Sequence, residues 1–342
     1  MSSSESPMLE HGGRVLAASR RWGRPVGEWL DLSTGISPWS WIEETGFAPS
    51  ASNWHTLPQD EDDALEQVAY THYGAPALAV AGSQAAIQAL PRLRAQRSRV
   101  GIATPTYAEH AAQWERAGHT VLALDPSRID AEIWDLDVLV VCNPNNPDGR
   151  RVLQQRLLGW HATLARRRGW LVVDEAYADA EPSLSLASQA QHRGLVVLRS
   201  LGKFFGLGGA RVGFVLCDEP LRRALRPLLG PWCVAGPSRA VALRALQDHA
   251  WQAQQRVRLR QTSARLAEML TAHGLPPVGG CSLFQCVADP SAALRTAQLA
   301  SRGILVRPFA PSGLRFGLPR TDADWKRLEE ALAAARRPVI GP

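Results

Sequence analysis

The middle of the chain alternates short, uninterrupted apolar runs with stretches whose apolar residues recur at helical spacing. The apolar runs have the length of β-strands and stand at 77–83, 99–107, 120–125, 137–144, 170–176, 194–200 and 210–217. Runs of valine, leucine and isoleucine without polar alternation are typical of strands buried on both faces. The pattern predicts an α/β fold whose mostly parallel central sheet is covered by helices, with ligands at the carboxyl ends of the strands.

After this region the pattern changes. Helical spacing runs from 236 to about Ala272, strand-like segments follow at 282–288, 304–309 and 314–319, and a last helix is predicted over 322–337. We therefore expect a long connecting helix that leads into a smaller α+β domain. The expected division is an N-terminal segment (1–45) that joins the small domain and the substrate site, a large domain (46–250) and a small C-terminal domain (251–342).

Charge and cysteine content narrow the class of protein. The 342-residue chain has a net charge of +6, but its arginines are scattered over helical patterns without interleaved aromatic residues, so we expect anionic small molecules rather than nucleic acid as partners. No apolar run approaches the ~20 residues of a membrane span, and the N-terminus lacks a secretory pattern, which predicts a cytoplasmic protein. The five cysteines lack metal-ligand spacing, so we expect them to be reduced and expect no metal site.

One lysine stands out chemically. The chain has 38 lysine and arginine residues, yet only Lys203 and Lys326 are lysines, and Lys203 lies in the glycine-rich stretch "SLGKFFGLGG". A neutral amine can form a Schiff base with an aldehyde, whereas a guanidinium group stays protonated. An ordinary surface lysine is the alternative, but the flanking glycines indicate close approach of the backbone to another group.

Polar motifs follow several of the predicted strands. "GSQ" (82–84) stands at a strand-to-helix junction, where free amides can bind an anion. "CNPNNPDG" (142–149) ends a second strand, and Asp174 in "VVDEAY" ends a third. Each motif alone also has a plain structural explanation, as a turn or as a structural carboxylate.

Taken in order, "GSQ", "PTY", "NPNNPDG", "VVDEAY" and "SLGKFFGLGGARVGF" resemble the fold-type-I pyridoxal-phosphate enzymes of the class I and II aminotransferase superfamily, over residues 50 to 320. The resemblance implies pyridoxal 5'-phosphate as cofactor, a smaller second domain and a homodimer. Lys203 would then be the Schiff-base lysine and proton shuttle, Asp174 would pair with the pyridinium nitrogen, and Tyr107 would stack on the ring. These three are the catalytic residues that the resemblance implies.

The resemblance also implies the remaining ligands. Asn146 and Tyr177 would hydrogen-bond the ring hydroxyl oxygen, and Asn146 would also reach the substrate. Arg315 would clamp the substrate carboxylate. The cofactor phosphate would be bound by Gly82, Ser83, Gln84, Ser200 and Arg211.

Two N-terminal segments point to one branch of the superfamily. "HGG" (11–13) and "LDLSTGISP" (30–38) resemble threonine-phosphate decarboxylases of cobalamin biosynthesis, which are relatives of the histidinol-phosphate aminotransferases. The implied reaction is decarboxylation of L-threonine O-3-phosphate to (R)-1-aminopropan-2-yl phosphate. The implied ligands of this small anionic substrate are His11, Gly35, Ile36 and Arg307.

Alternatives remain at this stage. Because the Cα bond perpendicular to the cofactor ring is the one that breaks, the motifs alone do not separate decarboxylation from transamination, and a histidinol-phosphate or other amino-acid aminotransferase is the alternative. A non-catalytic regulator and a cofactor-free scaffold fit less well, because no DNA-binding pattern precedes residue 45 and the chemical residues are complete. One position departs from the family: Leu57 stands where a tyrosine commonly reaches the partner subunit's cofactor phosphate, and Trp54 is a candidate replacement.

Overall fold

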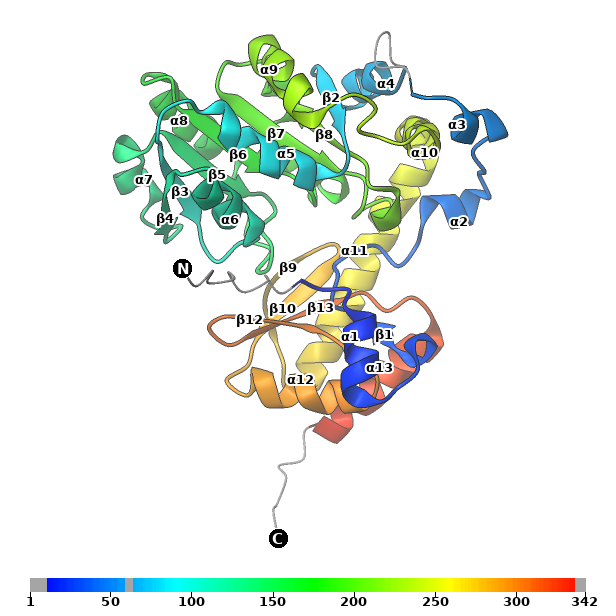
Figure 1. Ribbon diagram of the computed structural model, residues 1–342. Coiled ribbons are helices and arrows are strands. Elements are labelled where there is room, and N and C mark those ends of the chain that lie inside the picture. The colour runs from blue at the N-terminus through cyan, green and yellow to red at the C-terminus, as the bar shows by residue number, and fades with distance from the viewer. Residues whose placement is uncertain (1–10, 59–63, 336–342) are drawn as a thin grey trace, which may run out of the picture.

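The computed structural model describes residues 11–58 and 64–335, and Figure 1 shows them as two lobes joined by one long helix. We call the part built on a seven-stranded sheet the large lobe and the part built on a four-stranded sheet the small lobe. Within the described ranges, no helix is long and apolar enough to cross a membrane.

The large-lobe sheet has the strand order β2-β8-β7-β6-β5-β3-β4. Neighbouring strands from β3 to β7 pair in parallel, whereas β8 pairs antiparallel with both β7 and β2. Each of the seven predicted apolar runs contains one of these strands, so the predicted mostly parallel α/β sheet is confirmed. The strands are β2 (Ala77–Val80), β3 (Arg99–Ala103), β4 (Thr120–Leu124), β5 (Val138–Cys142), β6 (Trp170–Asp174), β7 (Leu195–Ser200) and β8 (Gly213–Leu216).

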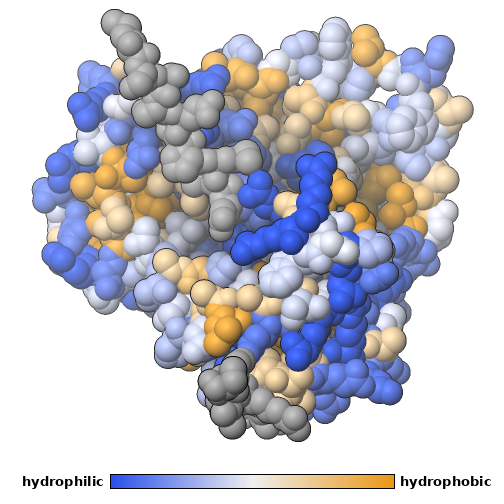
Figure 2. Space-filling view, turned by 60° about the horizontal axis from the view of Figure 1, so that its bottom comes forward, coloured by the Kyte–Doolittle hydropathy of each residue, from blue (hydrophilic) through white to orange (hydrophobic). Residues whose placement is uncertain are grey.

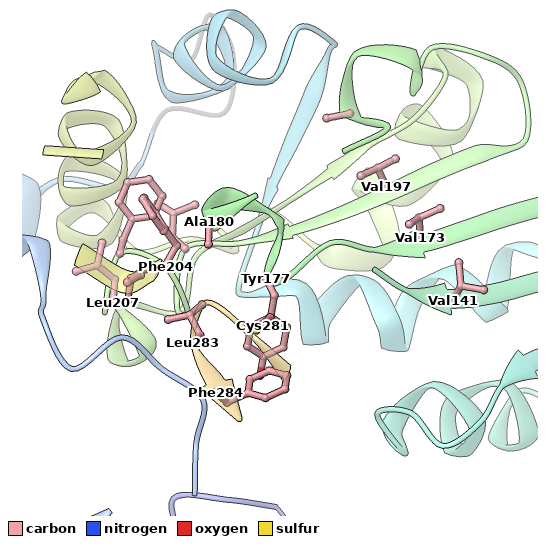
Figure 3. Close-up of a cluster of buried hydrophobic side chains, with 14 of the residues drawn as sticks. Val141, Val173, Tyr177, Ala180, Val197, Phe204, Leu207, Cys281, Leu283 and Phe284 are labelled. Atoms are coloured by element: carbon pink, nitrogen blue, oxygen red, sulfur yellow. The ribbon is translucent and has the colours of Figure 1, made fainter. Parts of the chain in front are cut away.

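The continuous apolar runs arise because helices cover both faces of this sheet. Val141, Val173 and Val197 lie side by side on one face and belong to one buried cluster (Figure 3), whereas their neighbours Val140, Val172 and Val196 belong to a second cluster on the other face. Successive strand residues point to opposite faces, so both sets must be apolar. The helices of this lobe are α4 (Ala64–Tyr73), α5 (Ser83–Ala89), α6 (Glu109–Arg116), α7 (Ile129–Glu132), α8 (Gln154–Ala165), α9 (Glu219–Leu229) and α10 (Gly236–Gln247).

The predicted connecting helix is α11 (His249–Ala272), which runs from the large lobe into the small lobe (Figure 1). The small-lobe sheet has the order β12-β13-β10-β9 and is antiparallel. Helices α12 (Ala292–Ser301) and α13 (Asp322–Ala335) belong to the same lobe. Its strands are β9 (Pro277–Cys281), β10 (Phe284–Ala288), β12 (Arg307–Phe309) and β13 (Gly313–Gly317).

The N-terminal segment connects the two lobes. Helix α1 (Val15–Trp22) packs on the small lobe, and β1 (Leu30–Asp31) pairs in parallel with β11 (Ile304–Leu305). The chain then reaches the large lobe, where the Ser37 amide donates to the Lys203 carbonyl at 2.9 Å, and it continues into α2 (Trp41–Thr45) and α3 (Ala51–His55). We retain the division of the chain at residues 45 and 250 as a proposal.

The hydrophobic cores of the two lobes are in contact. Figure 3 shows Tyr177 of the large lobe beside Cys281 and Phe284 of the small lobe, and the Tyr177 and Phe284 rings lie 5.2 Å apart between centroids. The buried core is therefore continuous between the lobes beside the cavity described below. On the face shown in Figure 2, apolar residues gather in several patches separated by hydrophilic ones.

Candidate active site

A cavity of about 220 Å³ lies where the carboxyl ends of the large-lobe strands meet the N-terminal segment and the small lobe. Gly35 and Gly82 do not line it, but both contact residues that do. The lining residues that the sequence predicted are His11, Ile36, Ser83, Gln84, Tyr107, Asn146, Asp174, Tyr177, Ser200, Lys203, Arg211, Arg307 and Arg315.

Lys203 lies in the loop that follows β7, and its Nζ is 5.7 Å from the centre of the Tyr177 ring. Burial, with a smaller contribution from the Arg315 guanidinium, lowers the pKa of Lys203 to about 8. The amine therefore reaches its neutral, nucleophilic form much nearer to neutral pH than an exposed lysine does.

Asp174 ends β6 and is held from two sides. Its Oδ1 accepts a hydrogen bond from the Ala176 amide at 3.0 Å, and its Oδ2 lies 2.9 Å from Nε2 of His110 on α6. Burial alone would lower the pKa of His110, but hydrogen bonds to Asp174 and Cys142 outweigh it and raise that pKa to about 10. The carboxylate is thus fixed in orientation below the cavity and paired with a protonated ring.

His110 and Cys142 were not predicted as site residues. His110 stands three positions after Tyr107, so a helix beginning near 108 brings it to the same end of the sheet, but one histidine at that spacing gives little signal. Together with Asp174, their ligand atoms lie within 4.8 Å of one another. Three separate elements supply this group, so spacing along the chain could not reveal it.

Arg211 and the start of α5 form a cradle for an anion. Gly82 precedes α5 with a φ of +73°, and a Cβ atom there would lie 2.5 Å from an Arg211 terminal nitrogen, Nη2. Glycine is therefore required for the guanidinium to lie against this turn. Ser83 and Gln84 follow at the helix start, where backbone amides lack helical partners, and both line the same cavity as the planar cation of Arg211.

Arg315 crosses from β13 of the small lobe to the large lobe and is only 1% exposed. Its Nη1 donates to Oδ1 of Asn146 and its Nη2 to the Ser33 carbonyl, each at 2.5 Å. Its Nε is buried and makes no hydrogen bond with any residue that the structure describes. Both acceptors are neutral, so the positive charge of Arg315 remains available to an anionic ligand.

Tyr177 provides a direct test of whether a ligand belongs in this cavity. Its hydroxyl is buried and has no hydrogen-bond partner among the described residues, and burial raises the pKa of Tyr177 to about 12. A buried, unpaired hydroxyl is unfavourable by about 1–3 kcal/mol. Gly35 has a φ of +62°, and a Cβ atom added to it would lie only 3.1 Å from that hydroxyl oxygen. A side chain at position 35 therefore has no room to supply the missing hydrogen-bond partner. A bound group with a polar atom beside Tyr177 would supply it.

The proposed replacement for the family tyrosine is not part of this cavity. Trp54 and Leu57 are 73% and 62% exposed and do not line it. Neither residue therefore contributes to the cavity of its own chain. Either could contribute only to the cavity of a second copy of the chain.

Comparisons with known proteins show the family and the fold of this chain. The family described as aminotransferase class I and II matches residues 43–332. A threonine-phosphate decarboxylase of Pseudomonas aeruginosa is 52% identical over 334 residues, covering 97% of this chain and 99% of the relative. A threonine-phosphate decarboxylase of a Sinorhizobium species is 40% identical, covering 96% and 98%. The solved histidinol-phosphate aminotransferase of Sinorhizobium meliloti in complex with pyridoxal-5'-phosphate matches with a TM-score of 0.80 at 20% identity, covering 98% of each chain, which shows a shared fold.

Proposed function

This chain belongs to the class I and II aminotransferase family, and from that premise we propose that it binds pyridoxal 5'-phosphate and decarboxylates L-threonine O-3-phosphate to (R)-1-aminopropan-2-yl phosphate in cobalamin biosynthesis. The observation that carries the choice of substrate is the number of cationic groups around one small cavity. Three arginines among the described residues line it, namely Arg211, Arg307 and Arg315. A cofactor phosphate and an amino-acid carboxylate account for two of them, and a substrate phosphate accounts for the third.

The residues fit the cofactor. Lys203 would hold it covalently, and Asp174, fixed by His110, would face its ring nitrogen. Tyr177 would donate its otherwise unpaired hydroxyl to the ring oxygen, together with Asn146. The cradle of Arg211, Ser200 and the start of α5 would take the phosphate. When bound, the cofactor supplies an electron sink for the electron pair released as a bond to the substrate Cα breaks.

The protein's own residues would decide which bond that is. Arg315 is immobilised by Asn146 and Ser33, so it would hold the substrate carboxylate in one direction. Arg307 on β12 and His11 would hold the phosphate at a second point. Because the carboxylate and the phosphate of the substrate would be held at two separate points, the substrate would have one orientation in the cavity. The residues would thereby select the bond between Cα and the carboxylate as the one that breaks. Lys203 would then return a proton to the carbon that lost carbon dioxide.

We also propose that the protein is a homodimer. Exposed large apolar side chains lie in or beside α3, α4 and α9, namely Trp54, Leu57, Tyr70, Leu228 and Trp232. Tyr70 borders a hollow of about 1080 Å³ that is also lined by the edge strand β2, by α9 and by the segment after α9. A second copy seated here would cover the apolar residues and the open edge of β2. A cytoplasmic location stays a prediction.

The products of a single incubation test the proposed function. Purified protein with L-threonine O-3-phosphate should release carbon dioxide and an amino-alkyl phosphate in equal amounts, without any 2-oxo acid being consumed. Consumption of a 2-oxo acid with retention of the carboxylate would instead support the aminotransferase alternative.

A further inference from the structure

His11 is held by a carboxylate from a distant part of the chain. Its Nε2 lies 3.0 Å from Oε1 of Glu109, the first residue of α6, and the two side chains are 37% and 13% exposed. The other ring nitrogen, Nδ1, is buried and has no hydrogen-bond partner among the described residues. His11 lines the cavity, so a histidine with one nitrogen engaged and one unsatisfied stands beside the substrate space.

Glu109 itself is fixed by two amides. Its Oε2 accepts hydrogen bonds from Nε2 of Gln84 and Nε2 of Gln113, each at 2.9 Å. Gln84 in turn accepts a hydrogen bond from the Tyr107 hydroxyl at 3.2 Å. Although burial raises the pKa of Glu109, the hydrogen bonds from Gln113, Gln84 and His11 outweigh it and lower that pKa overall. Glu109 is therefore an ionised acceptor held in one position.

The backbone that follows His11 explains how the ring reaches this carboxylate. The Gly13 amide donates to Oγ of Ser33 at 2.8 Å, and Ser33 donates to Oδ1 of Asp31 at 2.5 Å. A Cβ on Gly12 would lie 2.3 Å from the Ser33 carbonyl oxygen, and Gly13 has a φ of +80°. The two glycines of the "HGG" motif let the chain pack on this turn, and the packing positions His11 above the cavity.

We propose that Glu109 is a specificity-determining positioning residue, which holds His11 through Nε2 so that Nδ1 donates a charge-assisted hydrogen bond to the phosphate of the substrate. The inference rests on the proposed function for the identity of that substrate. A ring nitrogen that faces a carboxylate donates to it, and a ring nitrogen that faces a phosphate donates in the same way. A carboxylate that orients one nitrogen of a histidine leaves the other in a defined direction, as in many histidine sites.

The test measures the contribution of the substrate phosphate to binding separately from that of the rest of the substrate. Glu109→Gln keeps the shape but removes the charge, so the KM for L-threonine O-3-phosphate should rise about five- to tenfold while kcat stays within about twofold, because a neutral hydrogen bond replaces a charged one. The affinity for L-threonine should not change. Glu115→Gln makes the same charge change on an exposed residue of the same helix and should behave as wild type.

A double-mutant comparison asks whether Glu109 acts through His11. His11→Ala with Glu109→Gln should be no weaker toward the phosphorylated substrate than His11→Ala alone. The proposal would be overturned if the double variant were weaker toward the phosphorylated substrate than His11→Ala alone. It would also be overturned if Glu109→Gln weakened L-threonine as much as the phosphorylated substrate. Gln113→Ala, which removes one amide from Glu109, should shift the same KM in the same direction by less, and retained cofactor absorbance would verify that each variant is folded.

Binding of O-phosphoethanolamine, which carries a phosphate and no carboxylate, distinguishes this inference from the proposed function. Calorimetry should show weaker binding to the Glu109→Gln holoenzyme than to wild type by about five- to tenfold. If that difference appears but wild type releases no carbon dioxide from L-threonine O-3-phosphate, the proposed function fails and the role of Glu109 stands. Equal binding to both proteins would refute the role of Glu109.

Discussion

Nε2 of His110 lies 2.9 Å from Oδ2 of Asp174, and both side chains are buried at the carboxyl end of β6. The pair joins a helix of the large lobe to the strand end that faces the cavity. A buried carboxylate is costly unless it is paired and hydrogen-bonded. His110 therefore gives Asp174 a buried partner and fixes its orientation, which its proposed role requires.

Removing the Asp174 side chain should reduce turnover much more than removing the His110 side chain. Asp174→Ala should lower kcat by orders of magnitude, because the cofactor ring would lose its charged partner. His110→Ala should lower kcat by about tenfold, in line with the loss of a group that orients another residue. Steady-state assays with the exposed His192→Ala as control check this. Near-normal activity of Asp174→Ala would contradict its assignment to the ring nitrogen.

Lys203 should be the site of cofactor attachment. Borohydride treatment of the yellow protein, followed by peptide mapping, should place the reduced cofactor on Lys203 and leave Lys326 unmodified. Lys326 lies exposed on α13, with a side chain 79% exposed, and serves as an internal control. Lys203→Ala should abolish turnover, because the described chain offers no other lysine near the cavity. A label on Lys326, or none, would overturn the site assignment.

The low pKa of Lys203 should also appear in protein stability. Its folded-state pKa of about 8 lies below the usual 10.5, so between these values the unfolded chain binds a proton that the folded chain does not. The free energy of unfolding of the cofactor-free protein should therefore rise with pH over this window, by up to about 3 kcal/mol. Lys203→Met should be the more stable protein at pH 7, and its advantage should shrink toward pH 10. An advantage that does not change with pH would show that folding does not lower the pKa of Lys203.

A charge on the exposed face of α4 should separate the proposed dimer. Tyr70 is 53% exposed and borders the hollow beside β2, so Tyr70→Glu should yield monomers by light scattering at micromolar concentration. Leu294, 55% exposed on α12 of the other lobe, provides the matched control, and Leu294→Glu should remain dimeric. Obligate interfaces bury on the order of 2,000 Å² or more. An active wild-type monomer would refute the homodimer.

The sequence predicted the parts of the fold whose burial leaves a simple pattern. All seven large-lobe strands were predicted from their apolar runs, which reflect coverage of both faces everywhere except at the partly exposed edge strand β4. Helix α11 was predicted because its helical spacing is long. Strand β9 was missed because it contains Gly279 and Gly280, and glycine is a weak strand former. Glycine is needed at position 279 because a Cβ atom there would lie 2.2 Å from the Asp148 carbonyl oxygen. Helices α1 to α3 are short and were missed for lack of a sustained pattern.

The sequence predicted those residues of the candidate site that stand inside a recognisable sequence motif. Lys203, Asp174 and Arg211 were found in this way, and the structure brings them to one cavity. His110 and Glu109 were missed because each acts through another side chain, and such pairs depend on contacts between segments far apart in the sequence. The Glu109 to His11 contact spans 98 residues, a distance at which no local pattern carries information.

Removal of each of the two arginines that we assign to the substrate should have a different effect on substrate preference. Arg315→Ala should weaken every amino-acid substrate, because all of them carry a carboxylate. Arg307→Ala should weaken L-threonine O-3-phosphate about ten- to a hundredfold more than L-threonine, which is the cost of one charged hydrogen bond to the phosphate. The ratio of kcat/KM for the two substrates reports this in each variant. An equal loss for both substrates in Arg307→Ala would remove Arg307 from the phosphate site.

The ratio of kcat/KM for L-threonine O-3-phosphate to that for L-threonine in the wild-type protein, with carbon dioxide release as the readout, tests the central claim most directly. If His11 and Arg307 each bind the phosphate, the phosphorylated substrate should be preferred by at least about a hundredfold. A ratio near one, or no carbon dioxide from either substrate, would contradict the assignment of this cavity to decarboxylation of a phosphorylated amino acid.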